Sequence, residues 1–211
     1  TVRGVGGHGS APDRAKDPVP VACEIVLAYQ SAVTRQFSVW DPVVLTVGRI
    51  AAGTKDNIIP DDAFVDATLR TFSAENRARA HEVVTRVTEH VAQAHGMTAE
   101  VTIGNGYPVT VNDVDEFAFS QGVVADLFGA DRWVDMANPE AGSEDMSFVL
   151  DEVPGAYLNV SACAFADVAD AEDNHSPRAA FDDAVVPDIA AALAEMALRR
   201  SRELAQGGVG A

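Results

Sequence analysis

The amino-acid sequence predicts a mixed α/β protein made of two parts. Apolar residues recur with a period of two in some segments and of about 3.6 in others, and the order of these segments changes near residue 106. Residues 1–106 follow the order β-α-β-β-α-β, which is typical of a ferredoxin-like layer with a four-stranded antiparallel sheet and two helices on one face. Residues 107–211 follow the order α-β-α-β-α, which indicates the C-terminal part of a larger α/β unit, because the strands are too few for a complete sheet.

Two amphipathic helices are predicted in the first part. The first begins after Asp17, a suitable N-cap, with Pro18 in its first turn. Its apolar positions keep helical spacing, as at Val21, Ile25 and Ala28. The second helix begins after the N-cap Ser73 and ends at Gly96. Its apolar stripe contains Val83, Val84, Val87 and Val91.

Four strands are predicted around these helices, at about residues 1–8, 43–51, 63–72 and 97–106. Apolar and polar side chains alternate in AFVDATLRTF, as in a strand that is buried on one face. The segment TKDNIIPDD before it is rich in turn-forming residues and is predicted to be a loop.

The second part alternates helices with extended segments. Helices are predicted in residues 113–129, 142–153 and 184–205, the middle one beginning as a loop with Ser143 as its cap. Residues 132–137 are predicted to be extended and residues 155–164 to form a strand, followed by an acidic loop at 165–183.

Composition limits the range of functions. The chain has 211 residues and a formal net charge of −17, which argues against nucleic-acid and membrane partners, since both need a basic surface. No apolar segment approaches the roughly 20 residues that a membrane span requires. Two cysteines are too few for a disulfide framework and favour a reducing, cytoplasmic setting. Cys23 lies in an apolar helical stretch and is predicted to be buried.

Two histidines lie in loops where binding residues are common. His8 is surrounded by glycines in GVGGHGSAP, and glycine lets the backbone come close to a ligand; the alternative is a strand-end turn with an incidental histidine. His175 lies in EDNHSPRAAFDD, where acidic neighbours could support a metal-bound imidazole. The alternative is a surface histidine, because zinc needs three or four protein ligands. We expect the other three histidines to be surface residues: His81, His90 and His95.

Several polar residues could contact a substrate, and each has a structural alternative. Glu144 and Asp145, in GSEDMS, could meet a ligand at a helix N-terminus or could simply complement the helix dipole. Arg70 could bind a carboxylate through two hydrogen bonds or pair with a neighbouring acid. Asn57 is by default a turn residue.

Taken in order, four motifs resemble the zinc aminoacylase and carboxypeptidase family: GGHGSAP followed by DPV, VGRIAAGTKDNIIPDDAFVDATLRTF, GSEDMSFVLDEVPG and NHSPRAAFDD. The resemblance is strongest to N-acyl-amino-acid amidohydrolases such as hippurate hydrolases and indole-acetyl-amino-acid hydrolases. It implies a lid or dimerisation domain at residues 1–106 and the C-terminal portion of a metallopeptidase catalytic domain at residues 107–211. It also implies hydrolysis of the amide bond of N-acyl amino acids or small peptides, two divalent metal ions (Zn²⁺, with Mn²⁺ or Co²⁺ as alternatives) and a homodimer formed through the lid.

The resemblance also implies a role for each candidate residue. His8 corresponds to the lid histidine that stabilises the oxyanion, often in the partner subunit's site, and Asn57 to the lid asparagine near the substrate. Arg70 corresponds to the arginine that holds the substrate carboxylate. The substrate loop of the catalytic domain corresponds to Gly142, Ser143 and Glu144. His175 corresponds to the C-terminal metal ligand.

The sequence departs from the family pattern in two respects. The family's other metal ligands and its catalytic glutamate precede the lid and are absent from this sequence, and Asp13 stands where this branch often has a histidine. We therefore expect this polypeptide alone to be inactive and to bind zinc poorly. The alternative functions are a non-catalytic ferredoxin-like dimerisation module and a ferredoxin-like module that binds a small molecule.

Overall fold

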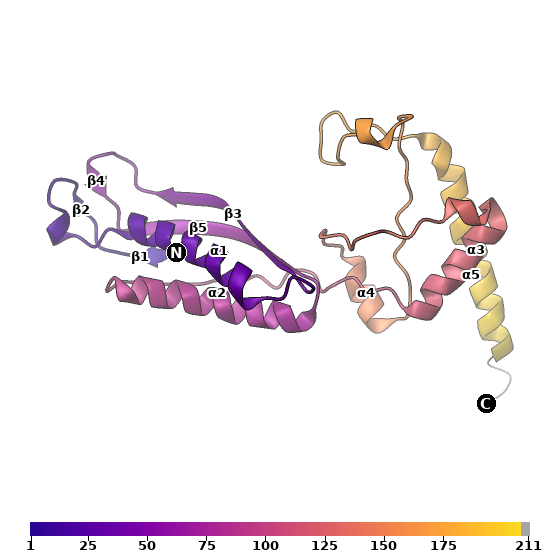
Figure 1. Ribbon diagram of the computed structural model, residues 1–211, viewed down its shortest axis with the longest axis horizontal. Helices are drawn as coiled ribbons and strands as arrows, with labels where there is room; N and C mark the ends of the chain where they lie inside the picture. The colour runs from indigo at the N-terminus through magenta and orange to yellow at the C-terminus, as the bar shows by residue number, and fades with distance from the viewer. Residues whose placement is uncertain (208–211) are drawn as a thin grey trace. The chain divides into compact units, whose positions relative to one another are not determined.

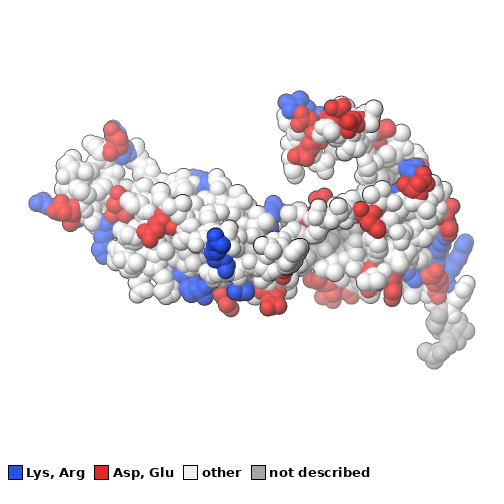
Figure 2. Space-filling view, viewed as in Figure 1, with Lys and Arg blue, Asp and Glu red and all other residues white. Residues whose placement is uncertain are grey.

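The computed structural model describes residues 1–207 and divides into two compact units. Unit 1 comprises Thr1–Val109 with Glu140–Ser143, and unit 2 comprises Thr110–Pro139 together with the residues that follow Ser143 (Figure 1). On the face shown in Figure 2, acidic side chains are spread over both units with basic side chains between them. Among the described residues, no helix is both long enough and apolar enough to cross a lipid bilayer.

Unit 1 is built on a four-stranded antiparallel sheet in the order β3-β5-β1-β6. The strands are β1 (Val2–Arg3), β3 (Val43–Ala52), β5 (Asp62–Thr71) and β6 (Thr98–Ala99). Two helices, α1 (Pro18–Gln36) and α2 (Ala74–Ala94), pack against each other and against the sheet. This strand order, with both helices on one face, confirms the predicted ferredoxin-like layer (Figure 1).

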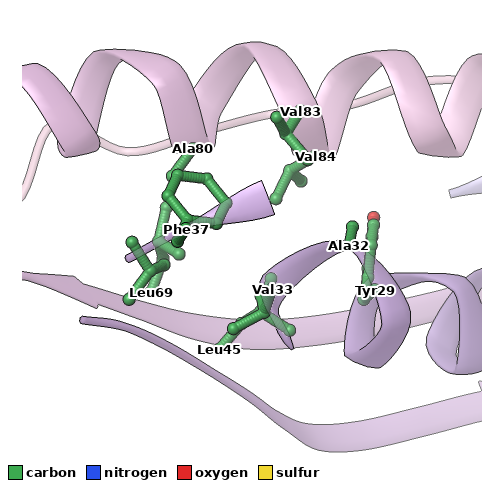
Figure 3. Close-up of a pocket in the computed structure, with 10 residues that line it drawn as sticks. Tyr29, Ala32, Val33, Phe37, Leu45, Leu69, Ala80, Val83 and Val84 are labelled. Atoms are coloured by element: carbon green, nitrogen blue, oxygen red, sulfur yellow. The ribbon is translucent and has the colours of Figure 1, made fainter. Parts of the chain in front are cut away.

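The core of unit 1 lies between the sheet and the two helices. Val43 and Leu45 of β3 are buried on the helical face, and Val21 and Ile25 of α1 face them from the other layer. Figure 3 shows Leu69 of the sheet beside Phe37 and Ala80 and Leu45 beside Val33, and Val83 and Val84 of α2 line the same space. The space that remains between these apolar side chains is a cavity of about 10 Å³. It is no larger than one water molecule requires, so we interpret it as imperfect core packing rather than a ligand site.

The predicted helix ends in unit 1 are correct. The Asp17 side chain accepts a hydrogen bond from the Val19 backbone N–H (3.0 Å), and Ser73 Oγ accepts one from Asn76 N–H (3.1 Å). Gly96 follows α2 with a φ of 67°, in the left-handed region that glycine tolerates best.

The prediction of one continuous strand over residues 1–8 is wrong. β1 ends at Arg3, Val5 forms an isolated bridge with Lys16, and β2 (Gly7–His8) pairs with β4 (Ile58–Ile59) in a separate two-stranded sheet. The backbone changes partners at Gly4, where a Cβ atom would lie only 2.2 Å from the Lys16 carbonyl oxygen. The predicted strand at 97–106 is likewise reduced to the two residues of β6.

Unit 2 contains α3 (Val114–Phe128), α4 (Met146–Glu152) and α5 (Val186–Gly207). The Arg200 guanidinium lies 4.0 Å from the centre of the Phe119 ring and bonds Glu116 Oε2 at 2.9 Å, which joins α5 to α3. Short 3₁₀ helices occur at η1 (Pro12–Arg14, in unit 1), η2 (Ala130–Arg132), η3 (Val168–Asp170) and η4 (Asp183–Val185).

Three further predictions are wrong, two of them in the region of the GSED motif and residues 155–164 and one in α1. Residues 155–164 form no strand. In the described part of unit 2, their one β-bridge is Cys163–Phe181, whereas a strand needs a neighbour that pairs with several consecutive residues. The N-cap of α4 is Asp145, not Ser143, and it makes no side-chain capping bond. Cys23 is exposed, because α1 turns Val21 and Ala22 toward the core and Cys23 away from it.

Candidate functional site

One end of unit 1 brings together two of the predicted site residues, His8 and Asn57. His8 in β2 pairs with Ile58 in β4, and the Gly9 N–H donates to the Asn57 carbonyl at 2.9 Å. A Cβ atom at position 9 would lie 3.1 Å from that carbonyl oxygen, so the close approach of the two segments favours glycine there. Gly9 therefore seats the His8 loop against the Asn57 loop.

Asp61 fixes the segment that leads to His8, and sequence reasoning missed this role. Its backbone carbonyl accepts from Gly4 N–H and its Oδ1 accepts from Gly6 N–H, both at 2.8 Å. The signal available in the sequence was an aspartate directly after Pro60, a position where side chains often bond nearby backbone. Asp61 thus bonds the histidine loop and does not pair with Arg70.

The His8 ring is exposed, and its Nδ1 faces Ser10. The Ser10 backbone N–H donates to Nδ1 at 3.2 Å, and Ser10 Oγ lies 2.8 Å from the same nitrogen. The other ring nitrogen, Nε2, is directed away from these contacts. Sequence reasoning did not single out Ser10, although its place two residues after a histidine in GHGS is the available signal.

Arg70 lies at the opposite end of β5. It pairs with Val44 of β3, and its Nη1 donates to the Ala141 carbonyl at 2.7 Å, so its partner is a neutral oxygen and not a neighbouring acid. The strand from Asp62 to Arg70 rises about 3.3 Å per residue, which separates the two ends of β5 by about 26 Å. Within one copy of the chain, the structure therefore does not bring Arg70 together with His8 and Asn57.

The GSED motif lies where the two units meet in sequence. Gly142 and Ser143 belong to the segment of unit 1 that Arg70 bonds, whereas Glu144 belongs to unit 2. Glu144 Oε1 accepts from Asp145 N–H, and Oε2 accepts from the Tyr157 hydroxyl, both at 3.0 Å. Tyr157 is a further partner that sequence reasoning missed, because its proximity depends on the path of residues 153–157.

These contacts shift the pKa values of the motif in opposite directions. Hydrogen bonding to the Asp145 side chain, and then to Tyr157 and Met146, lowers the pKa of Glu144. The bond to Glu144 and its negative charge raise the pKa of Asp145, and the same carboxylate raises the pKa of Tyr157. Glu144 is thus the acid of the pair that remains ionised, and Asp145 is the one that retains a proton more readily.

His175 lies in an exposed loop that is held by its neighbours. The Ser176 N–H donates to the Asp173 carbonyl at 2.8 Å, and Arg178 Nε donates to Glu172 Oε1 at 2.8 Å. In residues 1–207, no group of three or more histidine, cysteine, aspartate or glutamate side chains is arranged to hold a metal ion. His175 and its acidic neighbours therefore do not form a metal site by themselves.

The curated proteins that the chain resembles include two hydrolases and a carboxypeptidase. Residues 1–106 match the family model described as the peptidase dimerisation domain. IAA-amino acid hydrolase ILR1-like 2 of Arabidopsis thaliana is 34% identical over a match that covers 98% of this chain and 47% of that protein. Hippurate hydrolase of Campylobacter jejuni is 30% identical, covering 94% of this chain and 50% of that protein. Thermostable carboxypeptidase 2 of Saccharolobus solfataricus is 35% identical, covering 74% of this chain and 39% of that protein.

Two solved structures resemble the chain in fold. The Bacillus subtilis YXEP protein, described as a dinuclear metal binding peptidase from the M20 family, has a TM-score of 0.70 and 26% identity over 86% of this chain and 45% of that chain. A protein from methicillin-resistant Staphylococcus aureus has a TM-score of 0.78 and 24% identity over 91% of this chain and 49% of that chain. The chain spans half or less of the length of these curated relatives and structures.

Proposed function

Because the chain belongs to the M20 peptidase family, whose dimerisation domain its residues 1–106 match, we propose that it forms part of a metal-dependent amidohydrolase. The substrates that we propose are N-acyl amino acids and related small peptides, which agrees with the names of the hippurate and IAA-amino acid hydrolases that it resembles. Residues 1–106 form the lid, and residues 107–211 form the C-terminal portion of the catalytic domain.

The observation that carries this proposal is the separation of the candidate residues along β5. His8 and Asn57 share one end of unit 1, and Arg70 lies about 26 Å away along the strand. An N-acyl amino acid is far shorter than this distance, so one copy of the lid cannot place both groups on one substrate. We propose that each site uses Arg70 from one copy and His8 with Asn57 from another copy in a homodimer.

Each residue then has a chemical task. The Arg70 guanidinium, which donates to the neutral Ala141 carbonyl here, binds the substrate carboxylate more strongly because that acceptor is charged. The His8 Nε2–H donates to the amide oxygen as negative charge develops on it. Asn57 orients the acyl group beside His8, and the segment Gly142–Ser143 with Glu144 contacts the substrate from the catalytic domain.

The metal ions are proposed for the complete enzyme and not for this chain alone. A related structure is described as dinuclear, and Zn²⁺, Mn²⁺ or Co²⁺ would suit a site with histidine ligands. The groups present in residues 1–207 do not fit a complete site, so His175 is the one ligand that we assign to this chain. The remaining ligands would come from the portion of the relatives that the chain does not match.

The exposed edge of the sheet is the surface that we propose for dimerisation. β3 is an outer strand of ten residues, whereas the other outer strand, β6, has two. Gly48 in the middle of β3 has nothing within 4 Å of its Cβ position, so the backbone of a second copy can approach closely there. Val39 and Trp40, which are 80% and 93% exposed, precede the same strand and extend this surface with apolar area.

We also propose a cytoplasmic location. Both cysteines are free, and Cys23 is exposed, which is tolerated best where thiols stay reduced.

The function is tested by assaying a panel of N-acyl amino acids, with and without a chelator, using this chain and a complete M20 enzyme that carries its residues. We expect the complete enzyme to hydrolyse the panel, to lose activity with chelator, and to prefer substrates with a free carboxylate over the corresponding carboxamides. We expect this chain alone to be inactive. A complete enzyme without hydrolytic activity would favour the dimerisation or binding module instead.

A further inference from the structure

The contacts of His8 determine which of its ring nitrogens carries the proton. A backbone N–H can only donate, and the Ser10 N–H points at Nδ1 from 3.2 Å. The Ser10 hydroxyl, 2.8 Å from the same nitrogen, can donate as well. With the backbone N–H aimed at it, Nδ1 must be the accepting nitrogen, and the neutral ring therefore carries its proton on Nε2; the hydroxyl then adds a second donor to the same nitrogen.

We propose that Ser10 is a positioning residue that holds His8 as the Nε2–H tautomer with its N–H directed away from the loop. Ser10 itself is fixed by the turn that follows β2, in which the Ala11 N–H donates to the His8 carbonyl at 2.8 Å. Pairing of β2 with β4 fixes the His8 backbone on its other side. The contact between Ser10 and the His8 ring is therefore anchored, through the backbone of both residues, to the end of β2.

The tautomer matters because of the task assigned to His8, and in this respect the inference rests on the proposed function. A developing oxyanion needs a hydrogen-bond donor, and the opposite tautomer would present the lone pair of Nε2 to it. The ligand class that Ser10 helps to select is therefore the carbonyl oxygen of an amide. Ser10 touches no reacting atom and acts through His8.

A second histidine of the chain provides a matched control. His90 Nδ1 lies 2.8 Å from the Arg86 carbonyl oxygen, and a carbonyl can only accept. Its Nδ1 must therefore carry the proton, which makes His90 the opposite tautomer of His8. The two rings are both exposed and lie in the same unit.

The experiment is long-range ¹H–¹⁵N NMR of the side chains of the 211-residue chain at about pH 8.5, where ordinary imidazoles are neutral. The His8→Gln and His90→Gln variants assign the two rings. We expect His8 Nδ1 to resonate as an unprotonated nitrogen and His90 Nδ1 as a protonated one. The Ser10→Ala variant removes the hydroxyl and keeps the weaker backbone N–H contact. It should therefore raise the share of the Nδ1–H tautomer of His8 without abolishing the Nε2–H form, and Ser10→Thr should restore the single form, with His90 unchanged in both.

A His8 ring that is already a tautomer mixture in the wild type, or one that Ser10→Ala leaves unaltered, would overturn the inference. In a complete enzyme, Ser10→Ala should lower kcat about five- to tenfold with little change in KM, as expected for loss of one modest hydrogen bond. The NMR result does not depend on activity. If the tautomers behave as stated and His8→Ala leaves turnover normal, the oxyanion role is wrong and the role of Ser10 toward His8 stands.

Discussion

The two units of the chain differ in how their apolar side chains are used. Unit 1 buries a continuous core between its sheet and helices, whereas Val123 is the one buried apolar residue in the described part of unit 2. Large apolar side chains of unit 2 stay in contact with water, for example Leu193 at 64% and Phe181 at 58% exposure. His8, Asn57 and Arg70 therefore stand on a self-contained scaffold, whereas Glu144 and the loop that contains His175 are held by local hydrogen bonds.

The largest effect expected from this difference is on stability. Ile25→Ala removes a fully buried side chain from unit 1 and should lower its free energy of unfolding by about 2–5 kcal/mol. Leu193→Ala makes a similar change in unit 2 at an exposed position and should cost less than about 0.5 kcal/mol. Hydrogen exchange of α2 amides in unit 1 and of α5 amides in unit 2, together with urea unfolding, measures the two effects. Equal losses would mean that unit 2 has a core of comparable strength.

The second prediction concerns dimerisation, and it compares two glycines, one in each unit, that have free space at the Cβ position. Gly48→Lys in β3 and Gly122→Lys in α3 both add a side chain where nothing lies within 4 Å. We expect Gly48→Lys to weaken dimerisation at least about tenfold, because two lysines meet at the shared edge, and to leave the fold intact. Gly122→Lys should leave the association unchanged. Sedimentation velocity across a dilution series distinguishes the two, and equal behaviour would remove β3 from the interface.

The smallest expected effect is the change in stability with pH that arises from Glu144 and Asp145 in unit 2. The lowered pKa of Glu144 stabilises the folded state above the ordinary glutamate value of about 4.3 and loses that contribution as pH falls through the folded value. The raised pKa of Asp145 acts oppositely: it stabilises below about 3.9 and loses its contribution as pH rises. The two effects oppose each other, so we expect little net change in stability with pH.

The two pKa values should nevertheless move in opposite directions, that of Glu144 below and that of Asp145 above its ordinary value. Carboxyl ¹³C NMR of the two side chains measures both shifts. Tyr157→Phe should raise the pKa of Glu144, because it removes a hydroxyl that donates to the Glu144 carboxylate. A Glu144 pKa that is not lowered would contradict the contacts described for this motif.

Local signals were sufficient to predict the two helices and the two long strands of unit 1. Asp17 and Ser73 cap their helices through neighbours within three residues, and the alternation in AFVDATLRTF depends on the strand itself. The segment at 155–164 was mispredicted because a strand exists only with a paired neighbour, and residue composition does not provide one.

The candidate site was predictable as a set of residues and not as an arrangement. The family resemblance singled out His8, Asn57 and Arg70, but which of them are neighbours follows from the pairing of β2 with β4 and from the length of β5. The partners Ser10 and Tyr157 are ordinary polar residues whose importance depends on the atoms that they face. Long-range register and side-chain direction are the information that sequence pattern did not contain.

The shared site is tested most directly by mixing two inactive variants of a complete enzyme, His8→Ala and Arg70→Ala. Each variant alone should lose nearly all activity. If each site takes Arg70 from one copy and His8 from its partner, a mixed dimer contains one site with both residues intact. Random exchange of subunits should then restore about a quarter of the wild-type activity. Mixtures that stay as inactive as the separate variants would contradict the shared site and place both residues in one copy's site.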